Sequence, residues 1–134
     1  MGRRARDDAG FTLVELLVVI VIIAILAAIA IPMFLNQSKR AQDAAARSDI
    51  SNMGLQILSI VEKQPDLPTV TVTGRDFFVD GERVGQLSPN VEFLGIHGTN
   101  ISNWCIDVKN AKGAIAADQG FHYGATGGPA NGTC

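Results

Sequence analysis

A single acidic residue, Glu15, stands inside a long apolar segment and is the first candidate for chemistry. It is the only charged residue between Asp8 and Lys39, whereas residues 11–35 otherwise have the composition of a membrane-spanning helix. A carboxylate at the centre of a bilayer costs about 2.5–3.5 kcal/mol even on lenient insertion scales. Such an acid therefore indicates a functional role and needs a partner that compensates its charge.

Cleavage of a nearby peptide bond would supply that partner. If the chain is cut between Gly10 and Phe11, the new α-amino group lies four residues before Glu15, on the same face of a helix. An ammonium group and a carboxylate at this spacing attract each other. The sequence thus predicts a processing site at Gly10-Phe11 and a charge pair between Phe11 and Glu15.

Two simpler interpretations of this N-terminus compete with processing after Gly10. A secretory signal peptide also begins with basic residues, and Ala28-Ile29-Ala30 could be its cleavage site, but its apolar part spans about 7–15 residues and contains no acid. An unprocessed signal anchor fits the length and hydrophobicity of the segment. Neither interpretation explains Glu15.

Composition and charge limit the remaining possibilities. The 134 residues, 47% of them hydrophobic, suffice for one small domain and an apolar segment. The formal net charge is −2, and residues 1–10 contain three Arg and two Asp, so the side chains that follow sum to −3. Without a basic excess, the sequence lacks the electrostatic footprint of a nucleic-acid-binding protein, and its charge does not support DNA binding.

The basic residues and the cysteines indicate the same orientation of the chain in the membrane. Arg3, Arg4 and Arg6 precede the apolar segment, and such a cluster marks the cytoplasmic side of a membrane span. The C-terminal part should then be extracytoplasmic, where its two cysteines, Cys105 and Cys134, are expected to form one disulfide. The alternative is a pair of free buried thiols.

One helix is expected to extend well beyond the apolar segment. Apolar residues recur at three- and four-residue spacing after Asn36, which is the period of an amphipathic helix: Ile50, Met53, Ile57 and Val61. A helix from about Phe11 to Gln64 would be roughly 80 Å long at 1.5 Å per residue, compared with the ~30 Å hydrocarbon core of a bilayer. Its second half must therefore project outward and pack on a globular head.

Two residues are expected to disturb this helix. Pro32 lacks an amide hydrogen and clashes with the preceding turn, so it predicts a kink or local break near Ala28 to Pro32. Gly54 is a weaker candidate, because glycine costs about 1 kcal/mol relative to alanine in a helix.

The residues after Pro65 read as strands and turns, which makes the expected fold class α+β. Residues 69–73 alternate with period two, and Asp80-Gly81 is a strong signal for a hairpin turn between residues 77–79 and 82–84. Further strands are expected at residues 91–96, 104–109, 114–117 and 121–123, giving a small antiparallel sheet of about four strands.

The alternation around Cys105 places the C-terminal tail. Trp104 and Ile106 point to one face of their strand, whereas Cys105 and Asp107 point to the other. A tail that ends at Cys134 should therefore cross the outer face or the edge of the sheet.

No residue set indicates catalysis, a metal or a cofactor. His97 and His122 stand alone, whereas a zinc site needs three or four convergent ligands. Asp76, Asp80 and Glu82 lack the ligand spacing of a calcium loop and are expected to form a solvated hairpin tip. The sequence has no combination of nucleophile, base and orienting residue, so an enzyme is not expected.

The N-terminus as a whole resembles the processing signature of the type IV prepilins. The resemblance rests on a short charged leader ending in Gly10, then Phe-Thr-Leu-Val-Glu and a long aliphatic stretch. It implies that a prepilin peptidase cuts after Gly10 and methylates Phe11. It also implies a cleaved leader at 1–10, a transmembrane and assembly helix at 11–35, an amphipathic helix at 36–64 and a β-sheet head at 65–134 with a C-terminal disulfide loop.

The resemblance implies a helical homopolymer in which Glu15 pairs with the Phe11 amine of a neighbouring subunit. The implied partners are other copies of the chain, the peptidase, an inner-membrane assembly platform and, for the monomer, the membrane itself. The implied outputs are adhesion, twitching motility or DNA uptake. The alternatives are a pseudopilin of a type II secretion or competence system, whose major members resemble one another in a C-terminal acidic calcium loop, and a single-span membrane-anchored binding module.

The processing prediction can be checked directly on the exported protein. Because only a cut after Gly10 converts Phe11 into a cationic partner for Glu15, the mature protein should begin at N-methylated Phe11. Intact mass and N-terminal peptide sequencing would measure this. A chain that starts at Met1, or one that starts after Ala30, would contradict it.

Overall fold

The computed structural model of the chain describes residues 10–134. The predicted leader therefore lies outside the described residues except for Gly10, and so do Arg3, Arg4 and Arg6. The chain forms two units, the first ending at Asn36 and the second running from Gln37 to Cys134.

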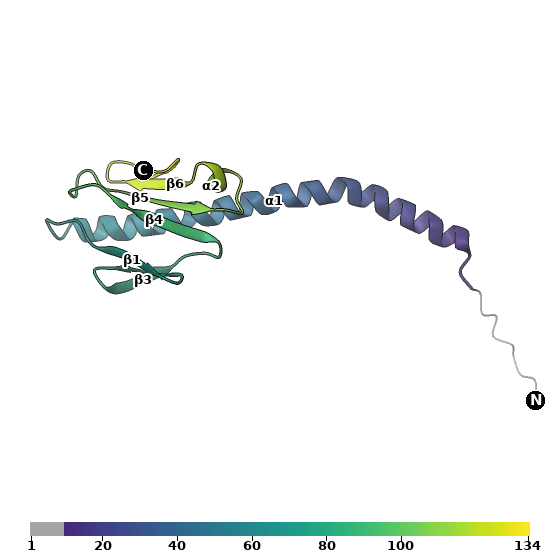
Figure 1. The fold of residues 1–134 in the computed structure, drawn as a ribbon, viewed down its shortest axis with the longest axis horizontal. Coiled ribbons are helices and arrows are strands. Elements are labelled where there is room, and N and C mark those ends of the chain that lie inside the picture. Colours follow the sequence, from purple (N-terminus) through teal and green to yellow (C-terminus); the bar gives the residue numbers. More distant parts are fainter. Residues whose placement is uncertain (1–9) are drawn as a thin grey trace, which may run out of the picture. The chain divides into compact units, whose positions relative to one another are not determined.

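The first element is the long helix α1, Leu13–Val61, and it confirms the helix expected from about Phe11 to Gln64 (Figure 1). Pro32 lies inside α1, which continues through it, so the chain does not break at this residue. The kink at Pro32 stays a prediction. The helix ends four residues before Pro65, the residue that was expected to terminate it.

The strands form two antiparallel sheets, where the sequence predicted one sheet of about four strands. The first sheet has the order β1-β2-β3 and the second β4-β5-β6-β7. Their bounds are β1 Val70–Thr73, β2 Asp76–Val79, β3 Glu82–Gln86, β4 Val91–His97, β5 Cys105–Asn110, β6 Phe121–Gly124 and β7 Pro129–Asn131. Strand β7 lies in the glycine-rich tail, where the sequence pattern did not predict a strand.

The strand expected at residues 114–117 is wrong, because this segment forms the short helix α2, Ile115–Asp118. The carboxylate of Asp43 on α1 accepts hydrogen bonds from the backbone amides of Ile115 (3.1 Å) and Ala116 (2.8 Å). These amides belong to the first turn of α2, whose own N-cap residue, Ala114, makes no side-chain cap. A side chain 72 residues away thus satisfies the donors that a helix start leaves free.

The hairpin predicted at Asp80-Gly81 is present. Both residues have positive φ angles, 51° and 82°, as a type I′ turn requires. At the base of this hairpin Arg83 forms an ion pair with Asp76 at 2.6 Å, and the hydrogen bond from Arg83 lowers the pKa of Asp76. Asp80 therefore takes part in the turn and Asp76 in an ion pair.

The core of the second unit lies between α1 and the strands (Figure 1). The buried face of α1 contains the four residues whose period predicted an amphipathic helix, and Trp104, Ile106 and Val108 are buried as their alternation predicted. The fully or nearly fully buried apolar residues of α1 are Ala46, Ile50, Met53, Ile57 and Val61. Burial of each large apolar side chain stabilises the fold by about 1.5–3 kcal/mol.

Polar contacts fix α1 along the strands as well. The buried side-chain amide of Asn110 donates hydrogen bonds to the backbone carbonyl of Gln42 at 3.2 Å and to its side-chain oxygen at 2.9 Å. The carboxylate of Asp49 accepts hydrogen bonds from the Ser88 amide and hydroxyl, at 2.6 and 3.0 Å. Burial raises the pKa of Asp49, although the bonds from Ser88 act in the opposite direction.

Gly54 has a packing role that the sequence did not reveal. It lies on the buried face of α1, and a Cβ at this position would overlap the ring of Tyr123 on β6. That ring stacks on Trp104, with ring centroids 6.1 Å apart. The glycine thus allows α1 to approach β6 closely.

Gly54→Ala should destabilise the head by about 1–3 kcal/mol, because overpacking outweighs the better helix propensity of alanine. The measurement is thermal unfolding of the processed protein in detergent, followed by the near-ultraviolet circular dichroism of Trp104, the only tryptophan. Gly127→Ala is the control, since a Cβ there would have no atom within 4 Å. Equal melting temperatures for the two variants would contradict this account of Gly54.

Candidate functional site

The Gly10-Phe11 junction precedes the first turn of α1 and is accessible. Phe11 is 88% exposed, and a Cβ on Gly10 would meet no atom within 4 Å. Helical structure begins two residues after Phe11, at Leu13. An exposed peptide bond that lies outside the helix fits a processing site, because exposed non-helical segments are where proteolysis concentrates.

Glu15 is hydrogen-bonded at the start of α1 by a residue that the sequence reasoning missed. Its Oε2 atom accepts bonds from the Thr12 amide and the Thr12 hydroxyl, each at 2.8 Å, and the Glu15 amide donates to Thr12 Oγ1 at 3.2 Å. This reciprocal arrangement is a capping box, with Thr12 as the N-cap and Glu15 three residues later. The pattern Thr-x-x-Glu before an apolar run would have revealed it.

The capping box provides hydrogen-bond donors to only one of the two carboxylate oxygens of Glu15. Both bonds reach Oε2, and among the described residues none reaches Oε1. The side chain is exposed within this single chain. Glu15 can therefore cap its own helix and still accept a hydrogen bond from a cation supplied by another molecule.

The first half of α1 has no cover from this chain. Its large apolar residues between Leu13 and Leu35 are 47–79% exposed. Among the described residues, α1 is the one helix that is long and apolar enough to span a membrane. The mean hydropathy of its most apolar window is 3.3. A helix that is apolar on all sides requires lipid or other helices around it.

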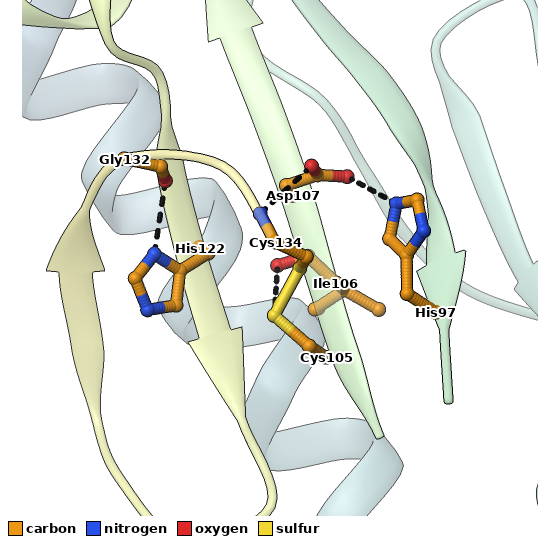
Figure 2. Close-up of a disulfide and its surroundings, with 7 residues drawn as sticks. All are labelled: His97, Cys105, Ile106, Asp107, His122, Gly132 and Cys134. Carbon is orange, nitrogen blue, oxygen red and sulfur yellow. Dashed lines mark hydrogen bonds and ion pairs between the residues drawn. A yellow bond between two sulfur atoms is a disulfide. The ribbon is translucent and has the colours of Figure 1, made fainter. Parts of the chain in front are cut away.

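The expected disulfide between Cys105 and Cys134 is present and fastens the C-terminal tail across the outer face of the second sheet (Figure 2). Strand β7 pairs with β6, and the chain then turns over β6 towards β5. The Cys134 amide donates to Asp107 Oδ2 at 3.1 Å, and His122 Nδ1 contacts the Gly132 carbonyl at 2.9 Å. The tail thus crosses the outer face, as the alternation around Cys105 predicted.

The structure places the site residues in two separate groups. Gly10, Phe11 and Glu15 lie at the start of α1, in the first unit, and Cys105 and Cys134 lie in the second. Asp107 joins the second group: it is buried, and it contacts His97 Nε2 at 3.1 Å. The two histidines that stand alone in the sequence, His97 and His122, thus both make polar contacts near the tail.

The chain matches a known family signature and several curated proteins. Residues 5–31 match the model of the prokaryotic N-terminal methylation motif. The chain is 38% identical to the fimbrial protein EcpB of Eikenella corrodens over 94 residues, which are 70% of this chain and 54% of that protein. It is 63% identical to the type IV wide pilus major component PilA4 of Thermus thermophilus over 38 residues, 28% and 29% of the two chains.

A relative from a different machine also matches. The chain is 42% identical to the type II secretion system core protein G of Pseudomonas aeruginosa over 45 residues, 34% of this chain and 32% of that protein. The chain spans about half or less of the length of these curated relatives. No solved structure matches it significantly.

Loss of the disulfide should loosen the tail. The disulfide links residues 29 positions apart and stabilises the fold by roughly 3 kcal/mol on chain-entropy grounds. Cys134→Ser removes this stabilisation. The melting temperature of the head should fall in this variant. It should fall by the same amount in the double variant Cys105→Ser/Cys134→Ser, which lacks the same bond. Mass spectrometry after alkylation of the native protein would detect two free thiols if the disulfide were not formed, which would remove the basis of the prediction.

Proposed function

Since the chain belongs to the type IV pilin family, we propose that it is the structural subunit of a type IV pilus filament. The protein is a structural subunit and no enzyme, and it fits a membrane-anchored precursor that is later assembled outside the cell. On this proposal, a prepilin peptidase removes residues 1–10 and methylates Phe11. Mature subunits then leave the membrane through an inner-membrane assembly platform and polymerise.

The observation that carries this proposal is the uncovered apolar half of α1. Its residues need an apolar environment, and lipid supplies one for the monomer. A bundle of the same helices from neighbouring subunits supplies another. Copies that contact each other by different faces, head to tail, form an open filament when the rotation between them does not close a ring.

Glu15 supports the proposal because its carboxylate keeps one oxygen without a partner among the described residues. The new amine of Phe11 on an adjacent subunit would donate to that oxygen once the leader is removed. The Thr12 bonds hold the carboxylate in place beforehand and lower the cost of its presence in an apolar helix. Processing would therefore switch on the attraction between subunits.

A pseudopilin of a secretion machine is the second candidate, favoured by the match to a type II secretion core protein. The C-terminal segment argues for a pilus subunit instead. Residues 120–134 contain no aspartate or glutamate and are closed by the disulfide, whereas the major secretion pseudopilins resemble one another in an acidic calcium loop there. Adhesion, twitching motility and DNA uptake are the outputs proposed for such a filament.

Substitutions of Glu15 test the proposed charge pair. Glu15→Leu removes both the charge and the capping box, and its filament yield should fall strongly. Glu15→Gln keeps the capping box, since glutamine serves at this position, but removes the charge. If the charge pair drives assembly, Glu15→Gln should be impaired as well. The measurement is the ratio of sheared filament to membrane-held monomer, with each variant expressed as the sole subunit.

Thr12→Ala is the matched control for the Glu15 substitutions. It weakens the helix start by about 0.5–2 kcal/mol but keeps the carboxylate, so its filament yield should exceed that of Glu15→Gln. Wild-type yield from Glu15→Leu would refute the charge pair. Normal assembly of Glu15→Gln, with loss in Thr12→Ala, would reduce Glu15 to a capping residue. Failure of the wild-type chain to enter filaments would overturn the filament proposal itself.

A further inference from the structure

The outer face of the second sheet gathers polar side chains from three strands beneath the C-terminal tail. Residues that are opposite each other in the register include His97 and Cys105 on β4 and β5, and Asp107 and His122 on β5 and β6. Figure 2 shows His97, Asp107 and the disulfide close together, with His122 on the far side of the tail. None of these contacts takes part in the proposed filament assembly.

Asp107 is unusual because it is a buried carboxylate held without a permanent cation. It is only 3% exposed. Its Oδ2 atom accepts a hydrogen bond from the Cys134 amide and its Oδ1 atom contacts His97 Nε2, each at 3.1 Å. Among the described residues no lysine or arginine forms an ion pair with it. A buried carboxylate of this kind is a favourable position for a bound cation.

The His97 ring lies beside Gly95 and faces Asp107. Gly95 is opposite Asp107 in the register of β4 and β5. A Cβ on Gly95 would lie 3.4 Å from His97 Nε2, which is an ordinary van der Waals contact, so the imidazole ring lies directly over this glycine. The His97 side chain is 54% exposed and can adjust its ring orientation. The imidazole is therefore directed at the carboxylate from an open side.

The sulfur of Cys134 completes a set with metal-ligand chemistry. Ligand atoms of His97, Asp107 and Cys134 all lie within 4.8 Å of one another. Cys105 Sγ lies outside this group but is bonded to Cys134 Sγ, so on reduction it is next to the sulfur that belongs to the group. In tetrahedral zinc sites with bonds of 2.0–2.3 Å, neighbouring ligand atoms are about 3.3–3.8 Å apart. Small side-chain movements would bring these four residues to that geometry.

We propose that the dithiol form of the protein binds Zn²⁺ through Cys105, Cys134, His97 and Asp107, so that the disulfide and the metal are alternative fasteners of the same tail. In the disulfide form the two sulfurs are bonded to each other, and the thiolates that bind zinc are absent. Imidazole and thiolate ligands are those that zinc prefers. Asp107 Oδ1 would contact the metal while Oδ2 keeps the Cys134 amide.

The exchange between the two forms conserves electrons and protons. A dithiol reductant gives two electrons and two protons to the Cys105–Cys134 disulfide and becomes a disulfide itself. Binding of Zn²⁺ then releases both thiol protons to solvent, and His97 carries its remaining proton on Nδ1 while Nε2 faces the metal. Two thiolates, one carboxylate and one Zn²⁺ sum to a single negative charge. The metal thus neutralises most of the charge that reduction uncovers.

Cobalt binding to the full-length protein in detergent tests this site. The protein is reduced with a dithiol, freed of reductant without oxygen, and titrated with Co²⁺. The expected result is one Co²⁺ per chain with a thiolate-to-cobalt charge-transfer band, displaced by Zn²⁺. The disulfide form should show no band. A reduced wild-type protein without the band, or a disulfide form that binds equally well, would overturn the proposal.

Two variants and a control assign the ligands. His97→Ala should weaken metal binding at least about tenfold, because even the loss of a residue that only hydrogen-bonds to a metal ligand usually costs that much. Asp107→Asn should weaken metal binding too. His122→Ala is the control: His122 lies on the same face but outside the ligand set, so binding should equal that of wild type. Because His97 is exposed, its variant should keep the fold, as circular dichroism can verify. Wild-type affinity in His97→Ala would exclude His97 as a ligand and refute the four-ligand site.

A second measurement does not depend on the spectrum. Zinc should slow reoxidation of the reduced wild-type protein by a disulfide oxidant, because coordinated thiolates are poor nucleophiles towards it. The same zinc concentration should protect His97→Ala less. Equal reoxidation rates with and without zinc in the wild-type protein would contradict the proposed site.

Discussion

The apolar surface of the first half of α1 is the constraint on which the rest of the structure depends. A sheet covers one face of a helix, but the residues between Leu13 and Leu35 are apolar on every side and exposed in the single chain. The segment therefore needs lipid or several other helices. The same helix then changes character, because after Gln37 most of its large apolar residues lie on one buried face, with Leu55 as the exposed exception. That change lets a single helix serve two environments, one outside the chain and one within the head.

The second half of α1 organises the head through both apolar and polar contacts. Ile50, Met53 and Ile57 are completely buried, and Gly54 between them admits the Tyr123 ring. Gln42, Asp43 and Asp49 on the same helix each bond to a different β-sheet connection or strand end. Apolar burial provides most of the stabilisation, whereas the polar contacts select one position of the helix along the strands. A subunit that must repeat identically in a filament benefits from such a fixed head.

The C-terminal tail shows how a segment without a core of its own is held in place. Its residues are small and polar and bury little apolar surface, so burial alone would not order them. Pairing of β7 with β6, the Cys134 bond to Asp107 and the disulfide together provide that order. The β7–β6 pairing holds the tail at the edge of the second sheet, and the other two contacts hold it on the outer face. The surface that the tail forms is therefore set by contacts around Asp107 and not by the apolar core.

The sequence by itself determined the features whose information is local. The length and period of α1, the turn at Asp80-Gly81, the inward face of β5 and the pairing of the only two cysteines follow from spacing within a few residues or from counting. The capping box of Thr12 and Glu15 was equally local and could have been predicted, because Thr-x-x-Glu before an apolar run is its signature.

Only the tertiary structure decided the features that depend on distant partners. Residues 114–117 resemble a strand until Asp43 caps them as a helix from 72 residues away. Strand β7 forms by pairing with the free edge of β6. The strands form two sheets, with no pairing between β3 and β4. Asp107 looks like a surface acid in the alternating pattern, yet the tail buries it, and Gly54 looks like a weak point in a helix, yet Tyr123 requires it. In each case the energy comes from a contact between residues far apart in the chain, which short-range patterns do not contain.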